Sequence, residues 1–398
     1  MPQSSDNRMH RRDFMRMVSV GFSTLPIGMQ ALAAGVKPVN IKDMILINAL
    51  GGMSNQNSWI DYVEKHSDSI GKASIIRMRS VDDRAINDTH TSGTTAINAT
   101  LGYVAGPEEP YEYTINDIAE WNAIIRQYPD DLLKVWTAED ILKAKKEHRI
   151  GVIFGFQNAQ SVGEDASRIK TFANLGVRII QLTYNDRNQI GDGSAVPDNE
   201  GLTTFGSEVV EALNENKVLV DLSHSGEKTC LDAIKASNVP ITISHTGCRA
   251  LANLPRNKTD EEIRQVAEKG GVVGIYFMPF LRVDGQARAS DVVNHIEHAI
   301  KICGEDHVGI GTDGDATNID DMKKYRLAIA GEIRQRQQAG VSAAGESNQV
   351  VPLIPDLMGP SQFQILADTL HSRDHSIARV EKLLGGNFLR LMRDVWQA

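Results

Sequence analysis

The sequence has few cysteines, no surplus of positive charge and no long apolar run, and each shortage excludes a class of protein. Cys230, Cys248 and Cys303 are the only cysteines in 398 residues and show no C-x-x-C spacing, so neither a disulfide framework nor a cysteine metal site is expected. A formal net charge of −9 argues against a nucleic-acid partner, which would require a basic face. No stretch reaches the length of a membrane span.

The first 34 residues have the pattern of an export signal. Adjacent arginines, Arg11 and Arg12, precede Phe14, a mildly apolar stretch and the small-residue sequence ALAAG. This order is typical of a twin-arginine signal peptide that ends in a cleavage site. We therefore expect residues 1–34 to be the signal, the twin-arginine translocase to be a partner during export, and the mature protein to be soluble in the periplasm.

Short, mostly continuous apolar runs predict buried parallel strands, covered on both faces. The runs are residues 44–48, 73–78, 150–156, 177–184, 218–223, 240–244, 271–277 and 307–312. Amphipathic stretches separate most of them, and this alternation predicts an α/β fold, a single (β/α)₈ TIM-type barrel over residues 40–398 with a C-terminal helical extension. A doubly wound open sheet is the alternative that periodicity leaves open. The polar stretch 323–355 is expected to form helix and loop over one end of the barrel.

Two successive predicted strands end in Ser-His, in VLVDLSHSG and PITISHTG. A single histidine just past a strand is more often a hydrogen-bonded loop residue than a ligand. In parallel βα folds, however, the carboxyl ends of the strands converge on one rim, where active sites lie. Two imidazoles on that rim, His224 and His245, make a natural pair of metal ligands.

Other strands of the predicted barrel also end in polar residues. They supply Gln157, Tyr184, Asn185 and Asp313 to the same rim, and Arg256 lies in the loop after His245. An aspartate after a strand is usually a turn former, yet beside two histidines a catalytic or ligand role becomes competitive. Arg256 is either a surface arginine or a fork of N–H donors for a substrate carboxylate.

The run from Gly201 to Phe277 resembles the renal (membrane) dipeptidase family of zinc peptidases, family M19, as do LGVRIIQLTYNDRN, HVGIGTDGDA and LLGGNFLRL. The resemblance covers about residues 40–395 and implies a (β/α)₈ barrel with a two-zinc site, acting on dipeptides, often as a homodimer. It implies that His224 and His245 bind one zinc and that Arg256 receives the terminal carboxylate of the dipeptide. Asp313 would lie beside the water and the substrate amine. Asn185, which follows the Leu-Thr of its strand on the same rim, is expected to bind substrate as well.

The sequence departs from the family pattern at the positions of the second zinc. Leu50 and Gly52 stand where the family has a His-x-Asp pair, and Gln157 replaces a bridging glutamate. Neither Leu50 nor Gly52 can bind a metal, and a neutral amide is a poor bridge. Tyr184 replaces a histidine that steadies the reaction intermediate, although its phenol can still donate a hydrogen bond.

These departures favour one zinc rather than two, with zero and two left open. The third ligand would be Gln157, Asp313 or His90, which with Asp88 is expected in a loop after the second strand. The sequence thus predicts a metal-dependent dipeptidase or amide hydrolase that acts on dipeptides or similar small peptide-like substrates. The alternative is a catalytically altered family member that binds a peptide-like ligand, or assists maturation of a secreted peptide metabolite.

Overall fold

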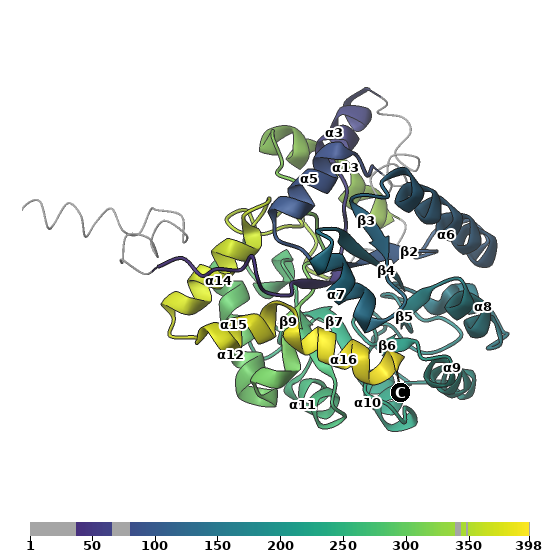
Figure 1. Cartoon of the computed structure of the whole chain (residues 1–398). Helices are drawn as coiled ribbons and strands as arrows, with labels where there is room; N and C mark the ends of the chain where they lie inside the picture. Colours follow the sequence, from purple (N-terminus) through teal and green to yellow (C-terminus); the bar gives the residue numbers. More distant parts are fainter. Residues whose placement is uncertain (1–36, 66–79, 339–343, 348, 398) are drawn as a thin grey trace, which may run out of the picture.

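The computed structural model describes residues 37–65, 80–338, 344–347 and 349–397. Parallel strands form the centre of the molecule and helices surround them (Figure 1). The expected export signal, residues 1–34, lies outside the described residues. None of the described helices combines the length and the apolar character that crossing a bilayer requires.

The helices and strands alternate along most of the chain. The strands are β1 (Ile47–Gly51), β2 (Ala96–Leu101), β3 (Leu132–Lys134), β4 (Ile150–Phe156), β5 (Val177–Gln181), β6 (Leu219–Asp221), β7 (Thr242–Thr246), β8 (Val272–Ile275) and β9 (Val308–Ile310). The helices are α3 (Gln56–Lys65), α5 (Asp83–Thr91), α6 (Pro110–Gln127), α7 (Ala138–Lys146), α8 (Arg168–Asn174), α9 (Thr204–Glu215), α10 (Glu227–Ala236), α11 (Asp260–Glu268), α12 (Ala289–Cys303), α13 (Met322–Gln338), α14 (Gln362–Ser372), α15 (Ile377–Glu381) and α16 (Asn387–Trp396).

Eight of the strands form a nearly closed parallel barrel, as the alternation of strands and helices predicts. Their spatial order is β1-β2-β4-β5-β6-β7-β8-β9, and β3 pairs with the start of β4. At the seam between β9 and β1, the Asp313 N–H donates to the Leu50 carbonyl at 2.9 Å, and the Asn48 side chain bonds Thr312. The alternative of a doubly wound open sheet is therefore wrong.

The second strand of the barrel differs from the expectation. The run 73–78 lies outside the described residues, and β2 (Ala96–Leu101) takes the place between β1 and β4. Its sequence, AINATL, mixes apolar with polar residues, and the amide nitrogen of Asn98 donates to the Ala49 carbonyl at 2.7 Å, while the Asn98 Oδ1 has no partner among the described residues. The other seven predicted runs each overlap an observed strand.

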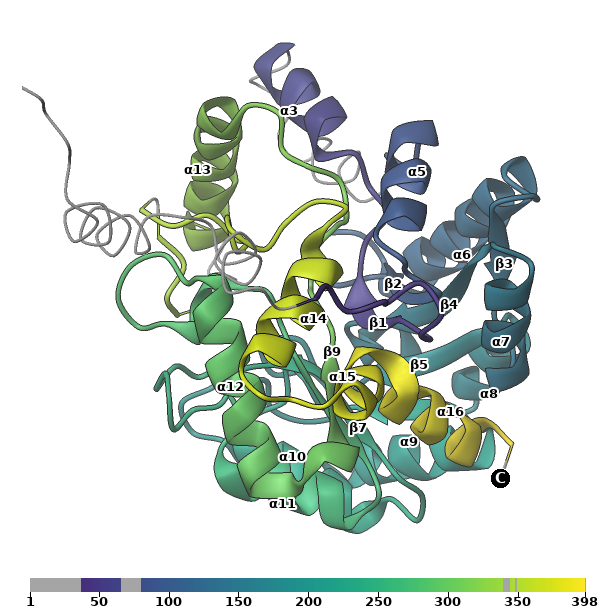
Figure 2. The same cartoon turned by 60° about the vertical axis from the view of Figure 1, so that its left-hand side comes forward.

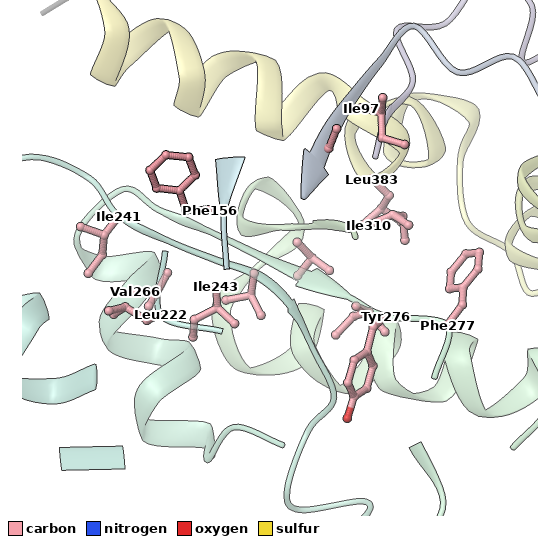
Figure 3. Close-up of a cluster of buried hydrophobic side chains, with 14 of the residues drawn as sticks. Ile97, Phe156, Leu222, Ile241, Ile243, Val266, Tyr276, Phe277, Ile310 and Leu383 are labelled. Carbon is pink, nitrogen blue, oxygen red and sulfur yellow. The ribbon is translucent and has the colours of Figure 1, made fainter. Parts of the chain in front are cut away.

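The core lies on both sides of the strands. Figure 3 shows Ile97, Leu222, Ile243 and Ile310, which come from or follow different strands and are almost fully buried. At the end of the barrel opposite the strand tips, α16 packs Phe388 and its neighbours against a second cluster. A large apolar core fixes the strands rigidly, so the side chains that follow them are held in defined positions.

A third apolar cluster lies outside the barrel. It joins α3 to α13 through Trp59, Ile60, Tyr325, Ile329 and Ile333. The two helices lie side by side over one end of the molecule (Figure 2). The predicted helix and loop within 323–355 therefore do cover an end of the barrel, and in the described part they form one wall of the cavity considered below.

The buried His295 of α12 joins two loops near that cavity. Its Nδ1 accepts from the Cys248 N–H at 2.8 Å, and its Nε2 donates to the Leu281 carbonyl at 2.9 Å. Burial lowers the pKa of His295 from 6.5 to about 4. Below pH 6.5 the unfolded chain therefore takes up a proton that the folded chain refuses, so stability is complete above pH 6.5 and falls toward pH 4.

We expect His295 to remove about 3 kcal/mol of folding stability across that pH window. Denaturant unfolding at pH 7, 5.5 and 4.5 measures the loss in the natural protein and in His295→Gln, whose amide can both accept and donate. The variant should lose less stability between pH 6.5 and 4. Equal losses in both proteins would show that another group is responsible.

Candidate active site

Five of the residues that the sequence assigns to the site line one cavity at the carboxyl ends of the strands. The cavity has a volume of about 170 Å³. Tyr184 and Asn185 come from the segment after β5, His224 from the segment after β6, Arg256 from the loop after β7, and Asp313 from the segment after β9. The rim position expected from parallel strands is thus the place where these side chains meet.

The two histidines face each other with their Nε2 atoms 3.1 Å apart. His245 lies within β7 and is fully buried, and His224 follows β6 and reaches the cavity. Tyr184 stacks on the His224 ring, with 4.2 Å between ring centroids and 22° between planes. Burial and the neighbouring cations Arg256 and Lys258 hold the pKa of His245 well below 6.5, so this ring is neutral.

The partners of the two Nδ1 atoms define which nitrogen carries the proton. His224 Nδ1 bonds the Asn185 amide oxygen at 2.7 Å, and His245 Nδ1 bonds Ser244 Oγ at 2.8 Å. An amide oxygen only accepts. Ser244 Oγ gives its single proton to Asp221 Oδ2 at 2.5 Å, so it also accepts from His245. Both rings therefore carry the proton on Nδ1.

The two Nε2 atoms lie 3.1 Å apart, so a metal ion or a proton has to bridge them. Facing acceptors repel each other unless a cation lies between them. Two nitrogens bound to one tetrahedral zinc at about 2.0–2.1 Å lie about 3.3 Å apart. The chemistry and the spacing of this pair therefore fit two ligands of one metal ion.

Behind the histidines, Asp221 orients the serines that precede them in the chain. Its carboxylate accepts from the N–H groups and hydroxyls of Ser223 and Ser244, at 2.5–3.0 Å. Burial raises the pKa of Asp221, and the four hydrogen bonds act against this by stabilising the charged carboxylate. A carboxylate behind a ligating histidine fixes the ring and makes it a stronger ligand.

A third protein ligand is not in place. Across the described residues, no group of three His, Cys, Asp or Glu side chains could hold a metal ion. Asp313 lines the cavity without completing such a group, and Gln157 donates to the Thr100 hydroxyl at 2.8 Å. Catalytic zinc normally has three protein ligands, so the expected set of two histidines with Asp313 or His90 is not formed.

His90 cannot be the substitute ligand. Asp88 and His90 belong to α5, which precedes β2, instead of a loop that follows the second strand. His90 lies 3.4 Å from Asp131 and lines a hollow with Thr95, at the start of β2. It is therefore at the opposite end of the barrel from His224. The expectation failed because the second strand was placed before this segment instead of after it.

Arg256 offers a donor to the cavity. It is 3% exposed, and its Nη1 donates to the Ser223 carbonyl at 2.6 Å. Its Nη2 has no partner among the described residues, and neither has the buried Nδ2 of Asn185. Buried donors without partners are costly. Both residues line the cavity, so these donors favour an anionic ligand in it.

Other side chains occupy the space around Leu50 and Gly52, the two positions at which the family resemblance implies ligands of a second zinc. Leu50 is buried, and a Cβ atom added at Gly52 would lie 2.3 Å from Asp315 Oδ1. Asp315 is fixed there, because Oδ1 accepts from the Ser54 N–H and hydroxyl at 2.8 Å and Oδ2 accepts from Gln56 Nε2 at 2.5 Å. Leu50 and Gly52 themselves therefore offer no ligand to a metal ion.

We expect Gly52→Asp to destabilise the protein by about 1–3 kcal/mol, because the new side chain overpacks the space that Asp315 holds. Denaturant unfolding measures the loss, and metal analysis should find no additional zinc. The double variant Gly52→Asp/Asp315→Ala should recover part of the stability. A stable single variant with an extra zinc would contradict this account of the site.

The sequence analysis did not assign Asp221 and its two serine partners, or the glutamates of the outer cavity wall, to the site. Asp221 had a signal, a carboxylate inside an otherwise apolar strand, and Ser223 and Ser244 are the serines of the repeated Ser-His. No sequence signal indicated that α13 and the following loop form a wall of the cavity. Glu332 and Glu346 are distant in sequence from the strand ends that form the rim. Their proximity to Arg256 is a property of the tertiary fold.

Comparison with solved structures agrees with the barrel fold. An amidohydrolase structure from Pseudomonas aeruginosa is 29% identical, with a TM-score of 0.72 over 90% of this chain and 98% of that one. A Rhodobacter sphaeroides metallopeptidase, 19% identical, has the same fold, with a TM-score of 0.67 over 89% of this chain and all of that one.

Curated sequences give related matches. An uncharacterized protein of the pqqA 5′ region of Klebsiella pneumoniae is 28% identical over 73% of this chain and 99% of its own length. A dipeptidase of Clonostachys rogersoniana is 29% identical over 61% of this chain, which spans 63% of that relative's length. The profile of the membrane dipeptidases matches residues 88–341. Since that match extends over more than half of the sequence, the chain belongs to the membrane dipeptidase family, peptidase family M19.

Proposed function

We propose that the protein is a metal-dependent hydrolase of dipeptides or similar small peptide-like substrates, and that it uses one metal ion, zinc, held by His224 and His245. The observation that carries the proposal is the convergence of the two imidazoles, whose Nε2 atoms lie 3.1 Å apart. Family membership supports the class of reaction. The packing of Asp315 against Gly52 supports one metal over two.

The cavity residues have separate parts in this proposal. Arg256 Nη2 and Asn185 Nδ2 bind the terminal carboxylate of the substrate, which satisfies two buried donors. The metal, when bound, would polarise the scissile carbonyl and make water more acidic. Asp313, on the same cavity, accepts the proton of the attacking water and returns it to the leaving amine. The Tyr184 hydroxyl donates to the oxygen that gains negative charge.

Metal analysis combined with a dipeptide panel tests the proposal. The mature protein is loaded with zinc and desalted, metal is counted by mass spectrometry, and free amino acids are separated by chromatography. We expect about one zinc per chain and release of amino acids from at least one dipeptide. Two zincs per chain would overturn the one-metal assignment.

One observation favours the second candidate function, a family member that binds a peptide-like ligand, or assists maturation of a secreted peptide metabolite, without hydrolysing dipeptides. In the described part of the chain, two histidines lack the third protein ligand of a catalytic zinc site. Dipeptide binding without metal and without release of amino acids would establish this function in place of hydrolysis.

The proposal also includes export of the protein to the periplasm. Residues 1–34 act as a twin-arginine signal, because Arg11 and Arg12 precede an apolar stretch and a small-residue cleavage site. Residues 40–398 form the mature domain, which works in the periplasm. Cell fractionation of an Arg11→Lys/Arg12→Lys variant tests this proposal: the variant should stay in the cytoplasm, whereas unchanged export would exclude the twin-arginine route.

A further inference from the structure

The wall of the cavity that faces away from the barrel carries two carboxylates. Glu332 belongs to α13 and Glu346 to the loop 344–347, and both line the same cavity as Arg256 and Asp313. Each glutamate also interacts elsewhere in the protein. A carboxylate has about four acceptor positions, so such an interaction leaves it able to accept from a ligand.

The charges along the cavity do not match a simple dipeptide. Among the described residues, Arg256 is the one lysine or arginine of the lining, against three acids, Asp313, Glu332 and Glu346. A neutral dipeptide has one carboxylate and one amine, which Arg256 and Asp313 can take. The two glutamates then face no substrate charge, although charge complementarity is what selects a ligand in such a site.

The apolar part of the lining has the form that a long aliphatic stem requires. Ile329, Ile333 and Val350 line the cavity beside the glutamates, and Phe280 lies on the side of the barrel. Lysine and arginine side chains bury their methylene stems on apolar surface and keep the charged head in a polar place. A lining that combines apolar side chains with two carboxylates therefore suits such a side chain.

We propose that the substrate is a dipeptide or dipeptide-like molecule with a cationic side chain, of the lysine or arginine type, whose head group binds Glu332 and Glu346. The inference rests on the proposed function, because it takes Arg256 as the carboxylate site. Its independent support is the guanidinium itself, 3% exposed, with Nη2 lacking a partner among the described residues of this cavity. An anionic end and a cationic end are thereby both assigned.

Isothermal titration with matched ligands tests the charge preference. The probes are Ala-Lys and Lys-Ala, each paired with its norleucine counterpart, which keeps the stem and lacks the amine. At least one lysine ligand should bind about tenfold tighter than its norleucine match, as expected for a charge-assisted hydrogen bond. The preference should vanish in Glu332→Gln/Glu346→Gln and persist in Glu211→Gln, an exposed control on α9.

The outcomes separate the two proposals. Equal binding of lysine and norleucine ligands, with one of them hydrolysed, would overturn the charge preference and leave the proposed function standing. A lysine preference that survives in the double variant would overturn the assignment to Glu332 and Glu346. No binding of any dipeptide would overturn the proposed function, and this inference with it.

Discussion

Replacing His245 by alanine is expected to abolish zinc binding and to lower kcat/KM for dipeptide hydrolysis by about 10³-fold or more. The metal would supply several kcal/mol of charge stabilisation to the reaction, and each 1.36 kcal/mol is a factor of ten in rate. With one of two histidines gone, a single imidazole remains among the described His, Cys, Asp and Glu side chains to hold the ion. His224→Ala should behave in the same way.

A matched variant separates ligation from support. Ser244→Ala keeps both imidazoles and removes the hydroxyl between His245 and Asp221. Loss of such a supporting group costs about 10–100-fold in metal affinity. Zinc competition with a chelator dye should therefore rank the natural protein above Ser244→Ala, and Ser244→Ala above His245→Ala. Equal zinc contents in all three proteins would show that the metal binds elsewhere.

The barrel was predictable because its strands are short, continuous and buried on both faces. Seven of the eight apolar runs overlap an observed strand. The strand β2 was missed because AINATL contains two polar residues and no continuous apolar run. Burial of the Asn98 amide nitrogen there is offset by its hydrogen bond to the Ala49 carbonyl. A partner that satisfies a buried amide is tertiary information, which local patterns do not contain.

The residues on the rim of the site could be predicted from the barrel topology, but those of its outer wall could not. His224, Arg256 and Asp313 each come shortly after a strand, so parallel strands bring them together. Glu332 is brought to the cavity by α13, which packs on α3 through Trp59 and Tyr325, and Glu346 lies in the loop 344–347 on the same cavity. This packing joins the apolar faces of two helices that are distant in sequence. No sequence motif indicates which apolar face packs against which.

A buried ion pair behind the His224 segment gives the second large expected effect. Lys258 and Glu262 are 1% and 0% exposed, with Nζ 3.2 Å from Oε1. Burial opposes both charges, but attraction between opposite charges outweighs it, so the pKa of Lys258 is raised and that of Glu262 lowered. Lys258 also donates to the Ser225 carbonyl at 2.5 Å and to Cys230 Sγ at 3.0 Å.

Lys258→Met should therefore lower the free energy of unfolding by about 3–5 kcal/mol, since it leaves the Glu262 carboxylate buried without its cation. Denaturant unfolding measures the loss. Lys258→Met/Glu262→Gln removes both charges and should recover most of the stability, because a neutral pair of similar volume has no ion to bury. If the double variant is as unstable as the single one, the unpaired charge is not the cause.

Loss of Lys258 should also alter the metal site, because Lys258 holds the backbone next to His224. Arg256 bonds the carbonyl of Ser223 and Lys258 that of Ser225, so two cations hold the residues on either side of His224. In the stable double variant this second bond is missing while both histidines remain. We expect its zinc affinity to fall, with Glu211→Gln unchanged as a control. Natural affinity in the double variant would show that Arg256 alone suffices to position His224.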